Sequence, residues 1–401
     1  MRCLLLILAA TAALAQSAPQ TRISRITENL RGVSAVSQTV AWAAGTHGSY
    51  LRTTDGLIWL PDHVPGAESL DFRAVVAFSA VEAFLMSSGP GDQSRIYHTA
   101  DAGRHWQLQF TNKDPKGFFD SMVFWDRTHG VVLGDPIQDE TGVLKFELLV
   151  TDDGQTWNPI PPAQLPPALE GEGAFAASNT CLAILPSLSK SLRMGSGFGD
   201  PGVSTPSTTI APSGKTSHSE SVKLQEREMA SASDPNIWFA TGGKAARVFH
   251  SPDRGHTWEV FDTPITHGPE SAGIFSIAFR DAMHGVIAGG DYKLPGQDGP
   301  NLAFTEDGGK NWTLSRIYPQ SYYSAVAYDY KSRHSTNNNK EQIRDRIFLV
   351  GPKFIYDFRP PKNPTRISAK KKDDSQFNAV SAYPEGGALV VGPKGVIINV
   401  P

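Results

Sequence analysis

The sequence predicts an all-β fold in which seven four-stranded sheets are arranged radially around one axis. A short motif, Ser/Thr-x-Asp-x-Gly-x-x-Trp, recurs along the chain at intervals of about 50 residues, the length expected for one four-stranded sheet of a ring. Seven segments of alternating apolar and small residues are spread along the chain, and helical periodicity is almost absent. These observations together predict a seven-bladed β-propeller.

The first 15 residues have the features of a secretory signal peptide. Arg2 supplies the positive charge, residues 4–14 are apolar, and Ala13 and Ala15 form a small-residue cleavage site. The apolar stretch is too short to cross a bilayer. We therefore expect cleavage after Ala15, a mature chain of residues 16–401 without a membrane span, and a periplasmic or secreted location.

Composition excludes several classes of partner and site. The 40 acidic and 37 basic residues nearly balance, so no overall charge favours binding to nucleic acid. Cys3 leaves with the signal peptide and only Cys181 remains, which excludes an internal disulfide and a multi-cysteine zinc site. Cys181 lies in an apolar run and is predicted to be a buried hydrophobic residue. We expect no metal site and no cofactor.

The repeated motif predicts a tight turn between two strands. A short acidic side chain accepts backbone N–H bonds within the turn, glycine takes the positive φ angle, and tryptophan packs at the start of the next strand. Residues 53–59 form a variant that is one residue short, and residues 150–157 a variant without the leading hydroxyl. The residues assigned to these structural roles are Asp101, Gly103, Trp106, Asp152, Gly154, Trp157, Asp253, Gly255, Trp258, Asp307, Gly309 and Trp312.

Seven innermost strands divide the mature chain into seven blades of a single domain. The last blade lacks a fourth strand, and residues 21–27 precede the first blade without a partner, so we predict that they close the ring as that missing strand. Residues 186–235 are rich in Ser, Thr, Gly and Pro and are predicted to be a disordered insertion. The innermost strand of the fourth blade is predicted at residues 174–177. The predicted blades are residues 33–64, 72–112, 119–162, 172–263, 273–318, 323–358 and 377–400.

The turn motif resembles the Asp-box of bacterial neuraminidases and their propeller relatives. Four further segments, residues 124–130, 171–178, 240–247 and 271–281, are similar to the YVTN/BNR-like superfamily, in the branch that contains photosystem II assembly factors. The resemblance covers essentially the whole mature chain. It implies a seven-bladed ring that acts as a binding or assembly scaffold. Bacterial relatives in this branch often carry names such as oxidoreductase or glycosyl hydrolase.

Catalytic motifs are not evident in the sequence. A sialidase would need an arginine trio, and the Arg-Ile-Pro motif of that family is replaced here by Arg22-Ile-Ser and Arg25-Ile-Thr. A glycan-acting hydrolase is the alternative, since Asp120 and Glu172 begin neighbouring inner strands and would face one another. An oxidoreductase is a second alternative by family naming only, because no dinucleotide-binding or haem motif is present.

The predicted ligand site is the funnel where the innermost strands begin, since polar residues from several blades converge there. We predict a binding scaffold for a protein partner, with a glycan as the other possible ligand, in a monomeric chain. The candidate funnel residues are Arg73, Asp120, Glu172, Arg247, Tyr323, Ser324 and Asn378.

Overall fold

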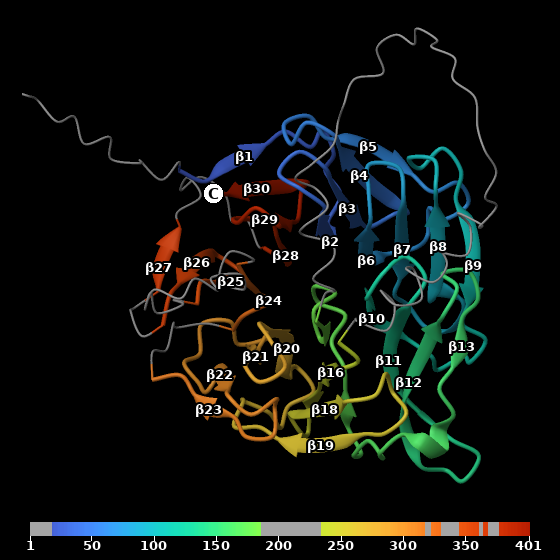
Figure 1. Ribbon diagram of the computed structural model, residues 1–401, viewed down its shortest axis with the longest axis vertical. Helices are drawn as coiled ribbons and strands as arrows, with labels where there is room; N and C mark the ends of the chain where they lie inside the picture. The colour runs from blue at the N-terminus through green and yellow to red at the C-terminus, as the bar shows by residue number, and fades with distance from the viewer. Residues whose placement is uncertain (1–17, 186–233, 317–321, 330–344, 361–363, 368–376) are drawn as a thin grey trace, which may run out of the picture.

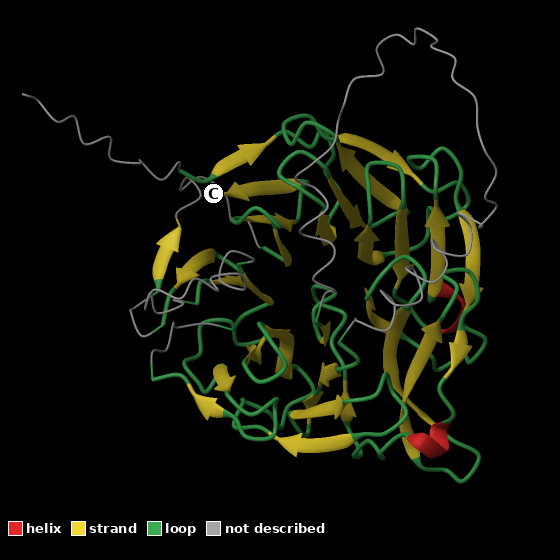
Figure 2. Cartoon of the chain, in the orientation of Figure 1, coloured by secondary structure: helices red, strands yellow, loops and turns green. Residues whose placement is uncertain are grey.

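A computed structural model describes residues 18–185, 234–316, 322–329, 345–360, 364–367 and 377–401. The predicted signal peptide and residues 186–233 of the predicted insertion lie outside these described residues. Seven antiparallel sheets surround a common axis, and Figure 1 looks along that axis. Two short 3₁₀ turns, η1 (Gly91–Gln93) and η2 (Pro162–Gln164), are the helical segments within the described ranges (Figure 2). The predicted seven-bladed β-propeller is confirmed.

Each blade contains four antiparallel strands from the axis to the rim, and two further short strands extend the fifth sheet. The first three blades are β2 (Leu30–Ala35), β3 (Ala41–Gly45), β4 (Ser49–Thr53), β5 (Leu60–His63); β6 (Phe72–Ala77), β7 (Ala83–Ser87), β8 (Arg95–Thr99), β9 (Gln107–Thr111); and β10 (Phe119–Phe124), β11 (Gly130–Gln138), β12 (Leu144–Thr151), β13 (Asn158–Pro159). The fourth and fifth are β15 (Leu182–Ile184), β16 (Ile237–Ala240), β18 (Arg247–Ser251), β19 (Glu259–Asp262); and β20 (Ala272–Phe279), β21 (Gly285–Asp291), β22 (Leu302–Thr305), β23 (Thr313–Leu314). The sixth and seventh are β24 (Ala325–Tyr328), β25 (Ile347–Gly351), β26 (Phe354–Phe358), β27 (Thr365–Ile367); and β28 (Ala379–Ala382), β29 (Ala388–Gly392), β30 (Val396–Val400), β1 (Gln20–Arg22).

The ring is closed by strand β1, which pairs with β30 as the outermost strand of the seventh blade. Three residues are in register, from Gln20 opposite Asn399 to Arg22 opposite Ile397. This pairing covers the outer edge of β30 and joins the two ends of the chain in one sheet. The predicted closure is therefore confirmed, although the strand is shorter than residues 21–27 and starts one residue earlier.

The fourth blade differs from the prediction. Residues 174–177 were expected to form its innermost strand, but they lie in a loop, and β15 takes that place eight residues later. The preceding short strand β14 (Glu172–Gly173) pairs instead with β17 (Gly242–Gly243), which extends the fifth blade through Gly273 of β20. The small residues of 174–177 had suggested a strand, but their backbone groups bond to side chains of the third blade and the first two blades, as described below.

Over the residues that the structure describes, the hydrophobic core consists of seven separate clusters, each between two neighbouring blades. In β7, for example, Phe84 packs toward the third blade and Leu85 toward the first. A strand whose two faces are both covered by other sheets reads as a continuous apolar run. This explains why the sequence of the inner strands shows such runs. Among the described residues, no helix is long and apolar enough to cross a membrane.

The repeated acidic turns connect the third and fourth strands of the first five blades. In the longer form, Thr99 Oγ1 accepts the Gly103 N–H at 3.0 Å and Asp101 Oδ1 accepts the His105 N–H at 2.9 Å. The turns of Asp253 and Asp307 repeat this pattern. Each glycine has a positive φ angle, for example +84° at Gly103.

The turn at residues 151–157 corrects one sequence assignment. Asp153, and not Asp152, accepts the N–H groups of Gln155 and Thr156, each at 2.7 Å. Thr151 supplies the hydroxyl that binds the Gly154 N–H. The motif here is thus Thr-x-Asp-Gly-x-x-Trp, the shorter form also present at residues 53–59, where Asp55 accepts two N–H bonds.

The tryptophan of each turn packs against the blade before its own. Trp106, from the second blade, contacts the cluster shared with the first blade, and Trp157, from the third, belongs to the cluster shared with the second. The other three follow the same rule: Trp59, Trp258 and Trp312. The turn motif therefore contributes both the corner within a blade and an aromatic contact between blades.

Candidate binding site at the mouth of the ring

The mouth of the ring is the end at which the innermost strands begin. The register of β2, β6, β10 and β20 shifts at their second or fourth residue, which marks a β-bulge in each. A bulge takes a residue out of the ladder and redirects its side chain. The bulged positions hold Arg31, Arg73, Asp120 and Phe275. Four blades thus present charged or aromatic side chains at equivalent places around the axis.

Two arginines from the first and second blades converge on one carbonyl oxygen. Arg31 Nη2 donates to Ala176 O at 3.5 Å, and Arg73 Nη1 donates to the same oxygen at 3.4 Å. Ala176 lies in the loop before β15, so this loop of the fourth blade reaches across to the opposite side of the mouth (residues 174–181 below are called the central loop). The two guanidinium groups are therefore close to each other.

The two arginines differ in how their charge is balanced. Arg73 Nε forms an ion pair with Asp71 Oδ2 at 2.8 Å, and its guanidinium lies 5.7 Å from the ring centre of Phe118. Arg31 Nε is buried and has no hydrogen-bond partner. Burial and the neighbouring charge of Arg73 lower the pKa of Arg31, although a guanidinium stays protonated at any physiological pH.

Buried carboxyl groups line the side of the mouth formed by the third blade. Asp120 is 1% exposed and its Oδ2 has no hydrogen-bond partner. Burial, followed by the charge of Asp135, raises the pKa of Asp120 well above its usual range. Burial also raises the pKa of Asp135 to about 6, despite the 2.9 Å hydrogen bond that its Oδ1 accepts from Ala174 N–H. Burial at this position therefore favours the protonated form of Asp120.

Aromatic rings form the wall at the fourth, fifth and sixth blades. Phe175 of the central loop stacks on Phe275, with ring centres 4.2 Å apart and planes at 17°. Tyr322, just before β24, and Tyr292, after β21, both contact Phe275. Tyr292 is 46% exposed, so this wall has an accessible aromatic edge.

The central loop is held by contacts to several blades. Asn179 has a φ angle of +60°, and its Oδ1 accepts bonds from Ser121 Oγ and Met122 N–H at 3.1 and 2.7 Å. Thr180 Oγ1 lies 2.7 Å from Ser276 Oγ of the fifth blade. Cys181 is fully buried in the cluster between the third and fourth blades, as expected for a hydrophobic role, and burial raises its pKa.

Glu172 and Arg247, two of the predicted funnel residues, form a closed ion pair. Arg247 Nε and Nη2 lie 2.9 and 2.5 Å from the two carboxylate oxygens of Glu172. Thr241 Oγ1 and the Leu169 N–H complete the bonds of this carboxylate, whose side chain is fully buried. The glycosidase alternative relied on Asp120 and Glu172 as free carboxylates, and Glu172 is not free in this arrangement.

The three other predicted funnel residues serve contacts between blades. Ser324 Oγ donates to Phe377 O at 2.9 Å, and Asn378 Nδ2 donates to Leu30 O at 2.7 Å across the closing seam. Tyr323 is fully buried, and burial raises its pKa. The structure thus brings together Arg73 and Asp120 from the predicted set. Sequence reasoning missed Arg31, although it occupies the same position in its strand as Arg73.

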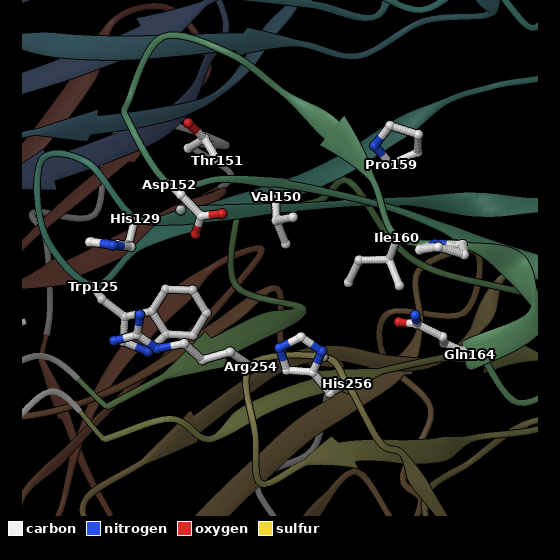
Figure 3. Close-up of a pocket in the computed structure, with 13 residues that line it drawn as sticks. Trp125, His129, Val150, Thr151, Asp152, Pro159, Ile160, Gln164, Arg254 and His256 are labelled. Atoms are coloured by element: carbon white, nitrogen blue, oxygen red, sulfur yellow. The ribbon is translucent and has the colours of Figure 1, made fainter. Parts of the chain in front are cut away.

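A second candidate site is a groove of about 380 Å³ between the third and fourth blades at the opposite end of the ring (Figure 3). Figure 3 shows Trp125, Arg254 and His256 on one side of it and Asp152 above them. The Arg254 guanidinium lies 5.2 Å from the Trp125 ring centre. In the described part of the chain, no three His, Cys, Asp or Glu side chains are grouped to hold a metal ion.

Solved structures show what this ring resembles. No protein-family model matches the chain, and no curated protein matches its sequence. The structure of YCF48 bound to D1 peptide has a TM-score of 0.58 at 13% identity, covering 97% of this chain and 98% of that one. YCF48 from Cyanidioschyzon merolae gives 0.54 at 14% identity, covering 96% and 98%. A streptogramin B lyase gives 0.55 at 8% identity, covering 96% and 97%. At these identities the likeness establishes the fold alone, and the same ring occurs in a peptide-binding protein and in a lyase.

Proposed function

We propose that this protein is an exported scaffold that binds a protein partner at the mouth of its ring. The observation that supports it most is the convergence of Arg31, Arg73 and the aromatic wall around Phe275 at one end of the axis. Arginine and tyrosine are enriched among residues that dominate protein interfaces. YCF48, one of the similar structures, was solved with a peptide bound, so a ring of this shape can carry such a ligand.

Export follows from the N-terminal sequence. Residues 4–14 form the apolar stretch and Ala15 ends the cleavage site. N-terminal sequencing of the mature protein from its native cells should then begin at Gln16. A mature protein that still began at Met1 would contradict export by this route.

Partner capture tests the binding role. The tagged mature chain would be crosslinked in the native compartment, and captured proteins would be identified by mass spectrometry. Tyr292→Ala removes the exposed aromatic edge of the mouth, and Leu108→Ala removes a similarly exposed apolar side chain from the outer strand β9. We expect Tyr292→Ala to lose the main partner and Leu108→Ala to retain it. Equal capture by both variants, or no specific partner for the wild type, would argue against binding at the mouth.

A further inference from the structure

The rim of the ring carries an exposed apolar patch beside the seam that closes it. Ile23 follows β1 and Ile58 precedes β5, and the two residues form a parallel β-bridge between the seventh and first blades. Figure 1 shows β1 and β5 following one another along the rim. The rim patch consists of Ile23, Leu57, Ile58 and Leu60, which are 74%, 58%, 50% and 54% exposed. Exposed aliphatic side chains gathered at one place are typical of a contact surface.

Comparison of the five acidic turns shows that the fold does not require these apolar residues. Each turn has two exposed residues between its glycine and its tryptophan, and a third directly after the tryptophan. In the first turn all three are aliphatic. In the other four turns all are polar: Arg104, His105 and Gln107; Gln155, Thr156 and Asn158; His256, Thr257 and Glu259; Lys310, Asn311 and Thr313. The acid of each turn bonds to backbone N–H groups in every case, so these positions need no particular side chain.

Charged residues accompany the rim patch in two rows. One row, residues 23–25, carries the exposed Arg25. The other row, residues 55–62, carries the exposed carboxylates of Asp55 and Asp62. The two rows run side by side in the same direction, because the bridge between them is parallel. The rim patch therefore has a basic row and an acidic row.

We propose that the rim patch binds the rim patch of a second copy of this chain across a two-fold axis. An axis parallel to the two rows places the basic row of each copy on the acidic row of the other. Arg25 of each copy then faces Asp62 of the other, and the aliphatic side chains meet between these contacts. A surface that is complementary to itself in this way is the requirement for a symmetric dimer.

Other kinds of contact fit the rim patch less well. Pairing of β5 with a strand of another molecule is disfavoured, because Pro61 and Asp62 lie within this outer strand. A lipid surface is disfavoured because the acidic row would face anionic headgroups. The contact between copies is therefore made by side chains.

This inference goes beyond the proposed function, because the rim patch lies on the outside of the ring and the mouth lies on its axis. Two rings joined at the rim would leave both mouths uncovered. A partner with two binding segments would then be held more tightly than by a single ring. The inference departs from the monomer expected from the sequence, since the exposure of the rim patch is evident only in the structure.

Sedimentation equilibrium of the mature chain tests self-association. We expect a monomer at about 1 µM and mainly a dimer at about 300 µM, because a patch smaller than a standard interface gives a weak dimer. The double variant Leu57→Gln/Ile58→Thr installs the residues of the third turn, which has the same short form. It should weaken the dimer about tenfold without lowering the melting temperature. The control Leu108→Gln removes an exposed leucine from β9 and should leave the dimer unchanged. A wild type that stays monomeric over this range would overturn the inference.

Charge variants test the two-fold arrangement. Arg25→Glu and Asp62→Lys should each weaken the homodimer, because like charges would face one another. An equimolar mixture of the two variants should form a heterodimer, since each of its two symmetric contacts again joins opposite charges. A mixture that associates no more tightly than either variant alone would refute the arrangement.

Other occupants of the rim patch give different results. A monomeric wild type that sediments with phosphatidylcholine vesicles, and loses this binding in Leu57→Gln/Ile58→Thr, would assign the patch to a lipid surface and overturn the inference. A monomeric wild type whose captured partner is lost in the same variant would assign the patch to another protein, with the same consequence. If the chain dimerises and Tyr292→Ala still captures the partner, binding at the mouth fails while the dimer remains.

Discussion

Replacing Asp135 with asparagine should stabilise the protein at neutral pH. Burial raises the pKa of Asp135 to about 6 in the folded chain, from 3.8. The folded state therefore holds this proton more tightly than the unfolded state, and the carboxyl group costs stability as the pH rises from about 4 to 6. This difference in pKa between the folded and unfolded states corresponds to a cost of about 3 kcal/mol above pH 6.

Asparagine removes this cost while keeping the local contact, because its amide oxygen accepts the Ala174 N–H that Asp135 Oδ1 accepts now at 2.9 Å. Urea unfolding of the wild type and Asp135→Asn between pH 5 and 7.5 would measure the difference. We expect Asp135→Asn to be more stable by up to about 3 kcal/mol at pH 7.5 and by about half as much at pH 5. The control Asp298→Asn alters an exposed carboxylate. A difference that is constant with pH, or that shrinks as the pH rises, would refute the reasoning.

Three further predictions concern the fold. Deleting β1 should lower the melting temperature by several degrees, because it exposes the edge of β30; an unchanged melting curve by circular dichroism would contradict closure by this strand. Asp153→Ala should lower the midpoint of urea unfolding because two N–H bonds are lost, whereas Asp152→Ala should leave the midpoint nearly unchanged. Equal effects of the two substitutions would refute the assignment. Glu172→Gln should lower the free energy of unfolding by about 3 kcal/mol because a buried ion pair is broken. Glu170→Gln, at an exposed neighbour, should leave the free energy of unfolding almost unchanged in the same assay. A Glu172→Gln variant as stable as the wild type would show that the ion pair contributes little.

The sequence was sufficient to predict the ring because its signals come from local physics. An inner strand such as β20 is buried on both faces, so its residues are apolar at nearly every position. The acidic turns are defined by residues within eight positions of one another, as in the turn of Asp101. The missing fourth strand of the last blade left β1 as the only unassigned candidate for that edge.

The assignments that were wrong depended on three-dimensional contacts that the sequence alone does not specify. Asp152 and Asp153 are adjacent, and only the hydrogen bonds from Gln155 and Thr156 decide which of them belongs to the turn. Residues 174–177 have the small side chains of an inner strand. Their backbone groups are taken instead by Asp135 of the third blade and by Arg31 and Arg73 of the first two.

The mouth was harder to predict than the ring for a physical reason. The bulged positions lie outside the ladder, so neither pairing nor the cores between blades restrict which side chain they carry. Their side chains are Arg31, Arg73, Asp120 and Phe275, four residues of different chemistry at equivalent places. The same freedom makes these positions suited to binding, because they can change without loss of the cores that hold the ring together. Arg31 follows from this reasoning once the bulge is known, because it occupies the bulged position of β2 as Arg73 occupies that of β6.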